Sequence, residues 1–287
     1  MYKFLILLAL SSGAVNAEKL SFQQSLNLST DRISALDVIS GAGDIDINTH
    51  NNNDIQVNAT IVSKKYRSME RFKEVFERDM VFGIERESEY AVLRGHTKPD
   101  LRKNPEIQIH LDILIPANLD VDIDDGSGAI RVVGLTGLLE IEDGSGDIEI
   151  SQVSNRIDID DGSGAIEINQ VKGSITIDDG SGSIHITNSD GDIDIDDGSG
   201  EIILNQSNGN KVIEDGSGDI TVKNSEGDVD IDDGSGDITL SSVNGSAVID
   251  DGSGSIYIDA LGGSLKIKSA GSGKVIIDGE NRTKEFK

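Results

Sequence analysis

The sequence predicts an all-β fold, a single-stranded parallel β-solenoid with an 18-residue coil, preceded by a β-rich region that contains one amphipathic helix. Three observations support this fold class. The tetrad Asp-Gly-Ser-Gly recurs every 18 residues. Apolar and polar residues alternate beside each tetrad, which is the period of a half-buried strand. Aromatic residues make up only 3%, so the interior must be built from aliphatic side chains. The first glycines of the tetrads are Gly126, Gly144, Gly162, Gly180, Gly198, Gly216, Gly234 and Gly252.

The repeat defines columns when the first glycine of each tetrad is taken as column one. Columns five, seven and sixteen are aliphatic throughout; column fourteen is aliphatic except at Lys211, and column twelve is glycine except at Asn155. Each coil therefore holds two short strands closed by glycine turns. Such a coil cannot bury an apolar face alone, but stacked identical coils can. We expect the solenoid over residues 118–270, and a degraded last coil with a cap over 271–287.

Known 18-residue solenoids differ from this pattern. The left-handed hexapeptide prism needs an aliphatic residue every six positions, and the inward spacing here is uneven. The calcium-binding nonapeptide roll needs Asp where this chain has Ile148 and its equivalents. The sequence leaves the handedness of the solenoid open.

The region over residues 18–117 is expected to be β-rich and to cap the open end of the stack. Ser40 to Ile47 resembles a drifted first copy of the repeat. The spacing of Met69, Phe72, Val75 and Phe76 predicts an amphipathic helix over about residues 67–80. This helix would cover the end of the sheet or pack on the preceding strands; a partner-binding helix is the alternative.

Residues 1–17 are typical of a secretory signal peptide. Lys3 precedes a short apolar stretch, and small residues end at Ala17, before Glu18. No later segment approaches the ~20 apolar residues of a membrane helix. The chain has no cysteine, so disulfides and cysteine-based metal sites are excluded. We therefore expect a periplasmic or extracellular protein that is monomeric and not inserted in a membrane.

Charge is distributed unevenly along the chain. The formal net charge is −27, and residues 118–287 hold 36 acidic against 11 basic residues. A surface this negative argues against nucleic acid and against anionic membranes. It favours cations or basic partners.

The acidic residues gather in pairs before each Gly-Ser-Gly. Stacking would place equivalent carboxylates about 5 Å apart, where they repel. One explanation is local: the second acid of each pair accepts hydrogen bonds from the turn as an Asx-turn, while the first points to water. The other is that calcium lies between coils. The candidate metal ligands are Asp125, Asp143, Asp161, Asp179, Asp197, Asp215, Asp233 and Asp251.

No residue pattern points to catalysis. A serine such as Ser127 or Ser145 recurs in every turn, which indicates a structural role, since catalysis needs one activated nucleophile beside a base. The four histidines form no recognisable constellation. The coils also lack the inserted loops from which solenoid lyases build their sites. We expect neither enzymatic activity nor a cofactor, calcium excepted.

The run from Ile107 to Pro116, then Leu119 to Ile123, and then tandem Gly-Ser-Gly-x-Ile-x-Ile units resembles the bacterial putative-adhesin family of β-strand-repeat proteins. The likeness covers nearly all of the chain after the signal peptide, and it carries over no catalytic residues. The resemblance implies a structural or adhesin-like protein of the cell envelope or surface that binds a protein or a glycan there. The alternative function is a calcium-binding solenoid.

Overall fold

The structure is a computed structural model that describes residues 19–101 and 104–286. The chain forms two compact units, divided between Asp143 and Gly144. The prediction of a signal peptide at residues 1–17 lies outside the described residues. The predicted boundary near residue 117 concerns where the regular repeat begins, and it stays a prediction.

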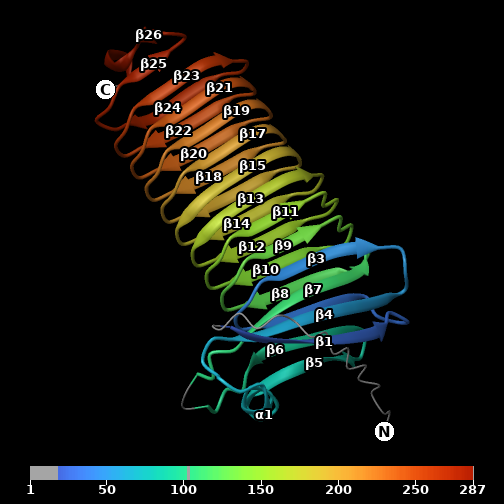
Figure 1. Ribbon diagram of the computed structural model, residues 1–287. Helices are drawn as coiled ribbons and strands as arrows, with labels where there is room; N and C mark the ends of the chain where they lie inside the picture. The colour runs from blue at the N-terminus through green and yellow to red at the C-terminus, as the bar shows by residue number, and fades with distance from the viewer. Residues whose placement is uncertain (1–18, 102–103, 287) are drawn as a thin grey trace. The chain divides into compact units, whose positions relative to one another are not determined.

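The second unit is a stack of parallel strands in two walls (Figure 1). Each coil contributes one strand to each wall, and consecutive coils pair in register at a separation of 18 residues, as in Ile148 opposite Ile166. The last coil is the exception, because a bulge between Ile249 and Asp250 shifts it by one residue, so that Ile256 lies opposite Val275. One wall, sheet A, has the order β11 (Ile148–Ser151), β13 (Gly164–Val171), β15 (Gly182–Asp190), β17 (Ile202–Asn208), β19 (Ile220–Glu226), β21 (Ile238–Asn244), β23 (Ile256–Leu261), β25 (Val275–Ile277) and β26 (Glu280–Asn281). The other wall, sheet B, runs through β12 (Ile157–Asp161), β14 (Ile175–Asp179), β16 (Ile193–Asp197), β18 (Lys211–Asp215), β20 (Val229–Asp233), β22 (Ala247–Asp251) and β24 (Leu265–Ala270).

The aliphatic columns form the interior of this unit. Columns five, seven and sixteen point inward, and Ile184, Ile195 and Ile202 have no exposed surface. The parallel solenoid predicted from the repeat is thus confirmed. At the end of the unit, β26 pairs antiparallel with β25, and the short 3-10 helix η1 (Thr283–Glu285) follows.

Glycine is required where coils touch backbone to backbone. A Cβ on Gly200, the second glycine of its tetrad, would lie 1.4 Å from the carbonyl oxygen of Gly182 in the preceding coil. A Cβ on Gly191, in column twelve, would lie 2.2 Å from the carbonyl oxygen of Gly173. Both distances are far below any real contact of a Cβ. The glycines of the repeat therefore mark the two corners at which each coil rests on its neighbour.

The first unit contains coils that do not stack in sequence order. Its walls have the orders β1-β4-β7-β3-β9 and β5-β6-β2-β8-β10. Their strands are β1 (Leu20–Ser29), β2 (Ala35–Ser40), β3 (Ile45–His50), β4 (Asp54–Ser63), β5 (Met80–Glu87), β6 (Tyr90–Thr97), β7 (Gln108–Pro116), β8 (Asp120–Asp125), β9 (Ile130–Val133) and β10 (Leu139–Asp143). The coil of β2 and β3 lies between the coil of β6 and β7 and that of β8 and β9, with parallel pairing throughout.

The drifted copy predicted at residues 40–47 is therefore a true coil of the stack. Ile45 pairs with Ile130, and the amide of Gly43 donates to the carbonyl of Ser127 at 3.0 Å. Antiparallel strands complete the unit: β4 lies between β1 and β7, and β5 pairs with β6.

The predicted amphipathic helix is present as α1 (Met69–Asp79), which begins at the N-cap Ser68. Phe72, Val75 and Phe76 are buried. Phe72 packs edge-on against Phe22 of β1, with ring centroids 5.1 Å apart, and stacks on Tyr66 at 5.6 Å. The helix thus packs on the strands of its own unit, which is the first of the two roles predicted for it.

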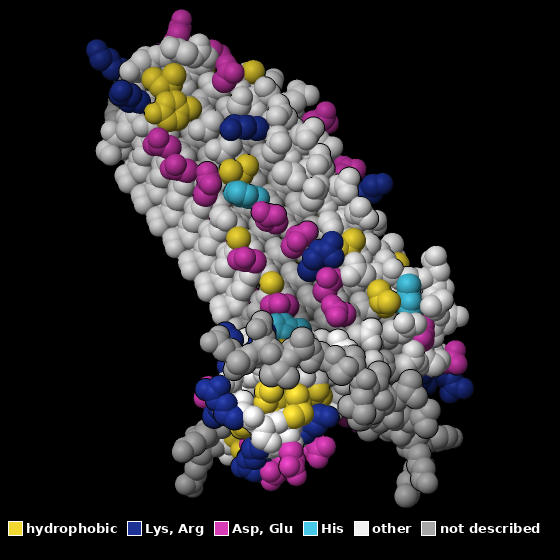
Figure 2. All heavy atoms as spheres, in the orientation of Figure 1, with side chains coloured by type: hydrophobic (Ala, Val, Ile, Leu, Met, Phe, Trp, Pro, Cys, Tyr) yellow, Lys and Arg dark blue, Asp and Glu magenta, His cyan; other side chains and the backbone are white. Residues whose placement is uncertain are grey.

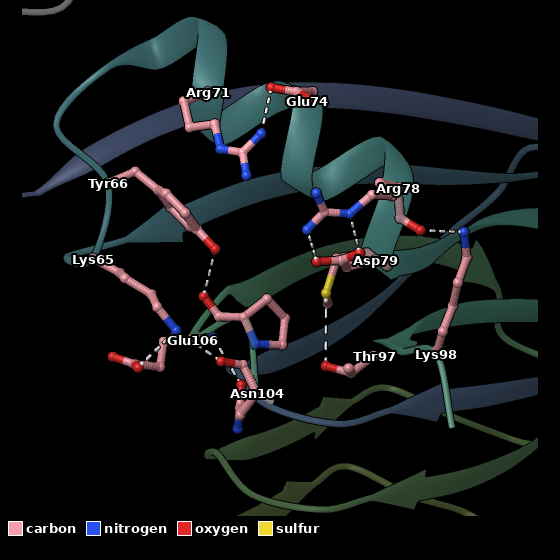
Figure 3. A network of polar contacts seen from close by, with 12 residues as sticks. Lys65, Tyr66, Arg71, Glu74, Arg78, Asp79, Thr97, Lys98, Asn104 and Glu106 are labelled. Atoms are coloured by element: carbon pink, nitrogen blue, oxygen red, sulfur yellow. Dashed lines mark hydrogen bonds and ion pairs between the residues drawn. The ribbon is translucent and has the colours of Figure 1, made fainter. Parts of the chain in front are cut away.

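Polar contacts fasten both ends of α1 (Figure 3). Before the helix, the Tyr66 hydroxyl donates to the carbonyl of Pro105 at 3.0 Å. After it, Lys98 donates to the carbonyl of Arg78 at 2.5 Å, and the Arg78 guanidinium binds both oxygens of Asp79 at 2.6 Å. The hydrogen bond from Arg78 holds the pKa of Asp79 below its usual value.

Candidate functional site: two acidic columns

The two acids of each pair have opposite environments. Along a strand of sheet B, side chains alternate inward and outward, so the aliphatic residue of column sixteen and the second acid of the pair share the inner face. The second acids, which we call the inner column, are 0–5% exposed. They are Asp125 and Asp143 in the first unit, and Asp161, Asp179, Asp197, Asp215, Asp233 and Asp251 in the second.

Each inner acid of the central coils closes its own turn. The Ser199 amide donates to Oδ1 of Asp197 at 2.9 Å, and the same bond, two residues apart, is found at Asp161, Asp179, Asp215 and Asp233 at 2.8–3.0 Å. This is the Asx-turn that the local explanation predicted, and it is confirmed at these five positions. The serine of the tetrad serves through its backbone: the Ser199 carbonyl accepts from the amide of Gly182 at 3.0 Å.

Burial raises the pKa of several inner acids. The pKa of Asp179 and of Asp197 rises to about 6 and that of Asp233 to about 7, because burial disfavours the charged form. The turn amides oppose this shift, and neighbouring aspartates add to it. The pKa of Asp215 is raised by the same burial.

The first acids of the pairs, the outer column, point to solvent. Asp178, Asp196 and Asp232 are exposed, and parallel pairing sets each one opposite its equivalent in the next coil. Two ion pairs lie on the outer face of sheet B: Arg156 binds Asp158, and Lys268 lies 3.7 Å from Asp230. The face of the second unit in view in Figure 2 also carries a line of acidic side chains along the stack.

The inner column does not assemble a metal site. Within residues 19–101 and 104–286, no three His, Cys, Asp or Glu side chains converge in a way that could hold a metal ion. The stack repeats one inner carboxyl per coil instead of gathering several around a point. Calcium coordination by these aspartates has no support from this geometry and stays a prediction.

A further exposed column, column nine of the repeat, was not predicted from the sequence. Seven residues in column nine are exposed and hold a left-handed backbone, with φ between 50° and 58°. They are Gln152, Gln170, Asn188, Gln206, Asn224, Ser242 and Ala260. Asn tolerates this conformation better than most residues, but Gln and Ala carry no such signal. The only cue in the sequence was the recurrence of amide side chains at a fixed column.

Lys211 was singled out as the exception in column fourteen, and the structure shows what it contacts. Its side chain is 1% exposed, and its ammonium donates to the carbonyls of Ser207, Gly209 and Glu226 at 2.5–2.8 Å. Burial lowers its pKa to about 8. The buried hydroxyls of Ser207 and Ser225 lie beside it, 2.9 Å apart. This corner of the interior is therefore polar but well bonded.

No helix among the described residues is long and apolar enough to cross a membrane. No protein-family model matches the chain, and no curated protein matches it.

Two solved structures are similar to the chain. One is a putative adhesin from Bacteroides fragilis, with 11% identity, covering 88% of this chain and 97% of its own, at a TM-score of 0.41. The other is a putative cell adhesion protein from Clostridium sporogenes, with 10% identity, covering 90% and 99%, at a TM-score of 0.28. Both likenesses are distant, and the fold described above stands on the strand pairing of this chain itself.

Proposed function

We propose that this chain is a non-enzymatic, adhesin-like structural protein of the bacterial envelope or surface. The observation that carries the proposal is the uniformity of the second unit. The coils from β11 to β22 use their inward residues for stacking and their tetrads for the turns, and they pair in register up to a bulge between Ile249 and Asp250 that shifts the last coil by one residue. Such a unit offers extended rows of repeated side chains to a partner, and its repeated serines and aspartates share one environment, whereas catalysis relies on one activated residue.

The partner in this proposal is a protein or glycan of the envelope. With a net charge of −27, the chain attracts basic groups and repels anionic surfaces. The exposed outer column is the most regular source of that charge. The calcium-binding alternative rests on the inner column instead, and no contact in the described residues favours it.

Binding and location are tested separately. Cell fractionation of the chain with and without residues 1–17 tests export, and retention of both forms in the cytoplasm contradicts it. Binding of the purified chain to isolated envelope is measured beside a variant with Asp178→Asn, Asp196→Asn and Asp232→Asn. Saturable binding that weakens in the variant and at high salt supports the proposal. Turnover of an envelope polysaccharide by the purified chain overturns the non-enzymatic part.

A further inference from the structure

The inner column contains carboxyl oxygens that nothing in the fold satisfies. In Asp179, Asp197, Asp215 and Asp233, Oδ1 accepts the turn amide, whereas Oδ2 is buried and has no hydrogen-bond partner among the described residues. These four side chains are at most 5% exposed. An ionised carboxylate oxygen in such a place has lost its water without a replacement, which is costly.

No basic group compensates for a negative charge there. The charged groups acting on Asp179 are Asp161, Asp197 and Asp178, and those on Asp233 are Asp215, Asp251 and Asp219. The charged groups acting on Asp197 are Asp215 and Asp196. In columns five and seven, sheet A contributes aliphatic side chains to the interior, as at Ile184 and Ile202, and its buried polar side chains are uncharged serines such as Ser207.

Lys211 is the buried base of this interior among the described residues, and its ammonium is already bonded to three carbonyls at the other end of β18.

The second oxygen also lies near a carbonyl oxygen of the preceding coil. The position that a Cβ of Gly200 would take lies 1.4 Å from the carbonyl oxygen of Gly182 and 3.1 Å from Oδ2 of Asp197. Similar distances recur at Gly182 with Asp179 and at Gly218 with Asp215. Two acceptor oxygens this close to one point repel each other when the carboxyl is ionised. A proton on Oδ2 removes the charge and supplies a donor.

We propose that Asp179, Asp197, Asp215 and Asp233 are held as neutral carboxylic acids, so that the second unit takes up protons when it folds. These four residues form a proton-binding row, with one site per coil, and this row does not depend on the proposed envelope function.

The consequence for stability has a definite sign. An unfolded aspartate loses its proton near pH 3.8, whereas in the fold Asp179 and Asp197 keep theirs to a pKa of about 6 and Asp233 to about 7. Between these values the folded chain binds more protons than the unfolded chain. Its stability is therefore highest in acid and falls as pH rises through 6 to 7.

The test is thermal unfolding of the chain at pH 5 and at pH 8 in high salt, which screens repulsion among the exposed acids. We expect the Tm to fall by about 5–10 °C between the two pH values. Asp197→Asn keeps the Oδ1 acceptor but cannot ionise, so it should raise the Tm at pH 8 and reduce the difference. The matched control is Asp232→Asn in the outer column, whose charge is not among those acting on Asp179, Asp197 or Asp233, and it should leave the difference unchanged.

A second measurement does not depend on any variant folding. Infrared spectra of the folded chain at pH 5 should contain the carbonyl stretch of protonated carboxylic acids, and this band should fade as the pH approaches 8. A Tm that is constant or rises from pH 5 to pH 8 overturns the proposal. So does a spectrum at pH 5 without a protonated carboxyl band.

Discussion

The two units solve the same stacking problem in different ways. The first unit uses contacts that occur once: an aromatic cluster around Phe72, a capped helix, ion pairs such as Arg94 with Glu85, and antiparallel strands beside its coils. The second unit uses a few contacts that recur from coil to coil, and its interior is made of aliphatic rows beside the row of buried inner acids. The second unit can therefore be built from one kind of turn and one pattern of buried residues. The first unit needs a different partner for each large side chain.

The largest expected effect is on the repeated turn. Gly200→Ala would place a methyl group 1.4 Å from a carbonyl oxygen of the preceding coil, and that coil cannot move without leaving its own neighbour. We expect a loss of about 4 kcal/mol or more in the free energy of unfolding, measured in urea. Gly83→Ala in β5 is the matched control, since a Cβ there meets nothing within 4 Å. Equal tolerance of both changes would refute the backbone-contact explanation.

Truncation of the aromatic cluster comes next. Phe72 is fully buried between Phe22 and Tyr66, so Phe72→Ala should cost about 3–5 kcal/mol in the first unit. Chemical denaturation and the protease sensitivity of α1 would report it. Lys73→Ala, on the same helix but half-buried, is the comparison and should cost less than ~1 kcal/mol. If both variants lost stability equally, the cluster would not be what holds α1.

Replacement of the buried lysine should have a smaller effect with the opposite sign. The equivalent residue one coil earlier is Ile193, on a strand that pairs with β18, so an aliphatic side chain suits this column. We expect Lys211→Ile to stabilise the chain by about 1–2 kcal/mol at pH 7. A destabilised variant would mean that the three carbonyl contacts outweigh the cost of burying the ammonium.

The wild-type lysine also predicts a pH effect. Its folded pKa of about 8 lies below the unfolded value of 10.5, so stability should rise with pH between these values. That rise should disappear in Lys211→Ile, and urea titrations at pH 8 and pH 10 would measure it.

The smallest expected effect is that of calcium. Because the inner carboxyls point into the interior one per coil, millimolar calcium should shift the Tm by less than about 1 °C relative to chelator at matched ionic strength. Magnesium at the same concentration is the control for non-specific screening of the outer column. A calcium-specific rise of several degrees would restore the metal-binding alternative at the inner aspartates.

The fold of the second unit could be predicted from the sequence better than that of the first, because its pattern recurs in every coil. Eight copies of one tetrad fix the coil length, and Ile in columns five and sixteen identifies the inner faces. The same alternation already implied that Asp197 points inward two residues after Ile195, an implication that the charge of the pair obscured. The left-handed backbone of column nine could not be predicted from the sequence, since residues such as Gln152 and Ala260 have no preference for that conformation.

In the first unit, Ile45 pairs with Ile130, although a helix and several strands lie between these residues along the chain. Local pattern predicted a drifted copy there, but not that residues 90–116 would form the coil on its other side. Such insertions leave no periodic trace, because each contact they make is made once.

The constant 18-residue register between β11 and β23 has a consequence for how such chains change length. Removing residues 180–197 would join Asp179 to Gly198. Every column would then lose one residue, and each turn would still be preceded by Asp. Duplication of the same segment would do the reverse. Unequal exchange between neighbouring repeats in the gene can therefore shorten or extend this protein in whole coils, leaving its chemistry the same and changing only its reach.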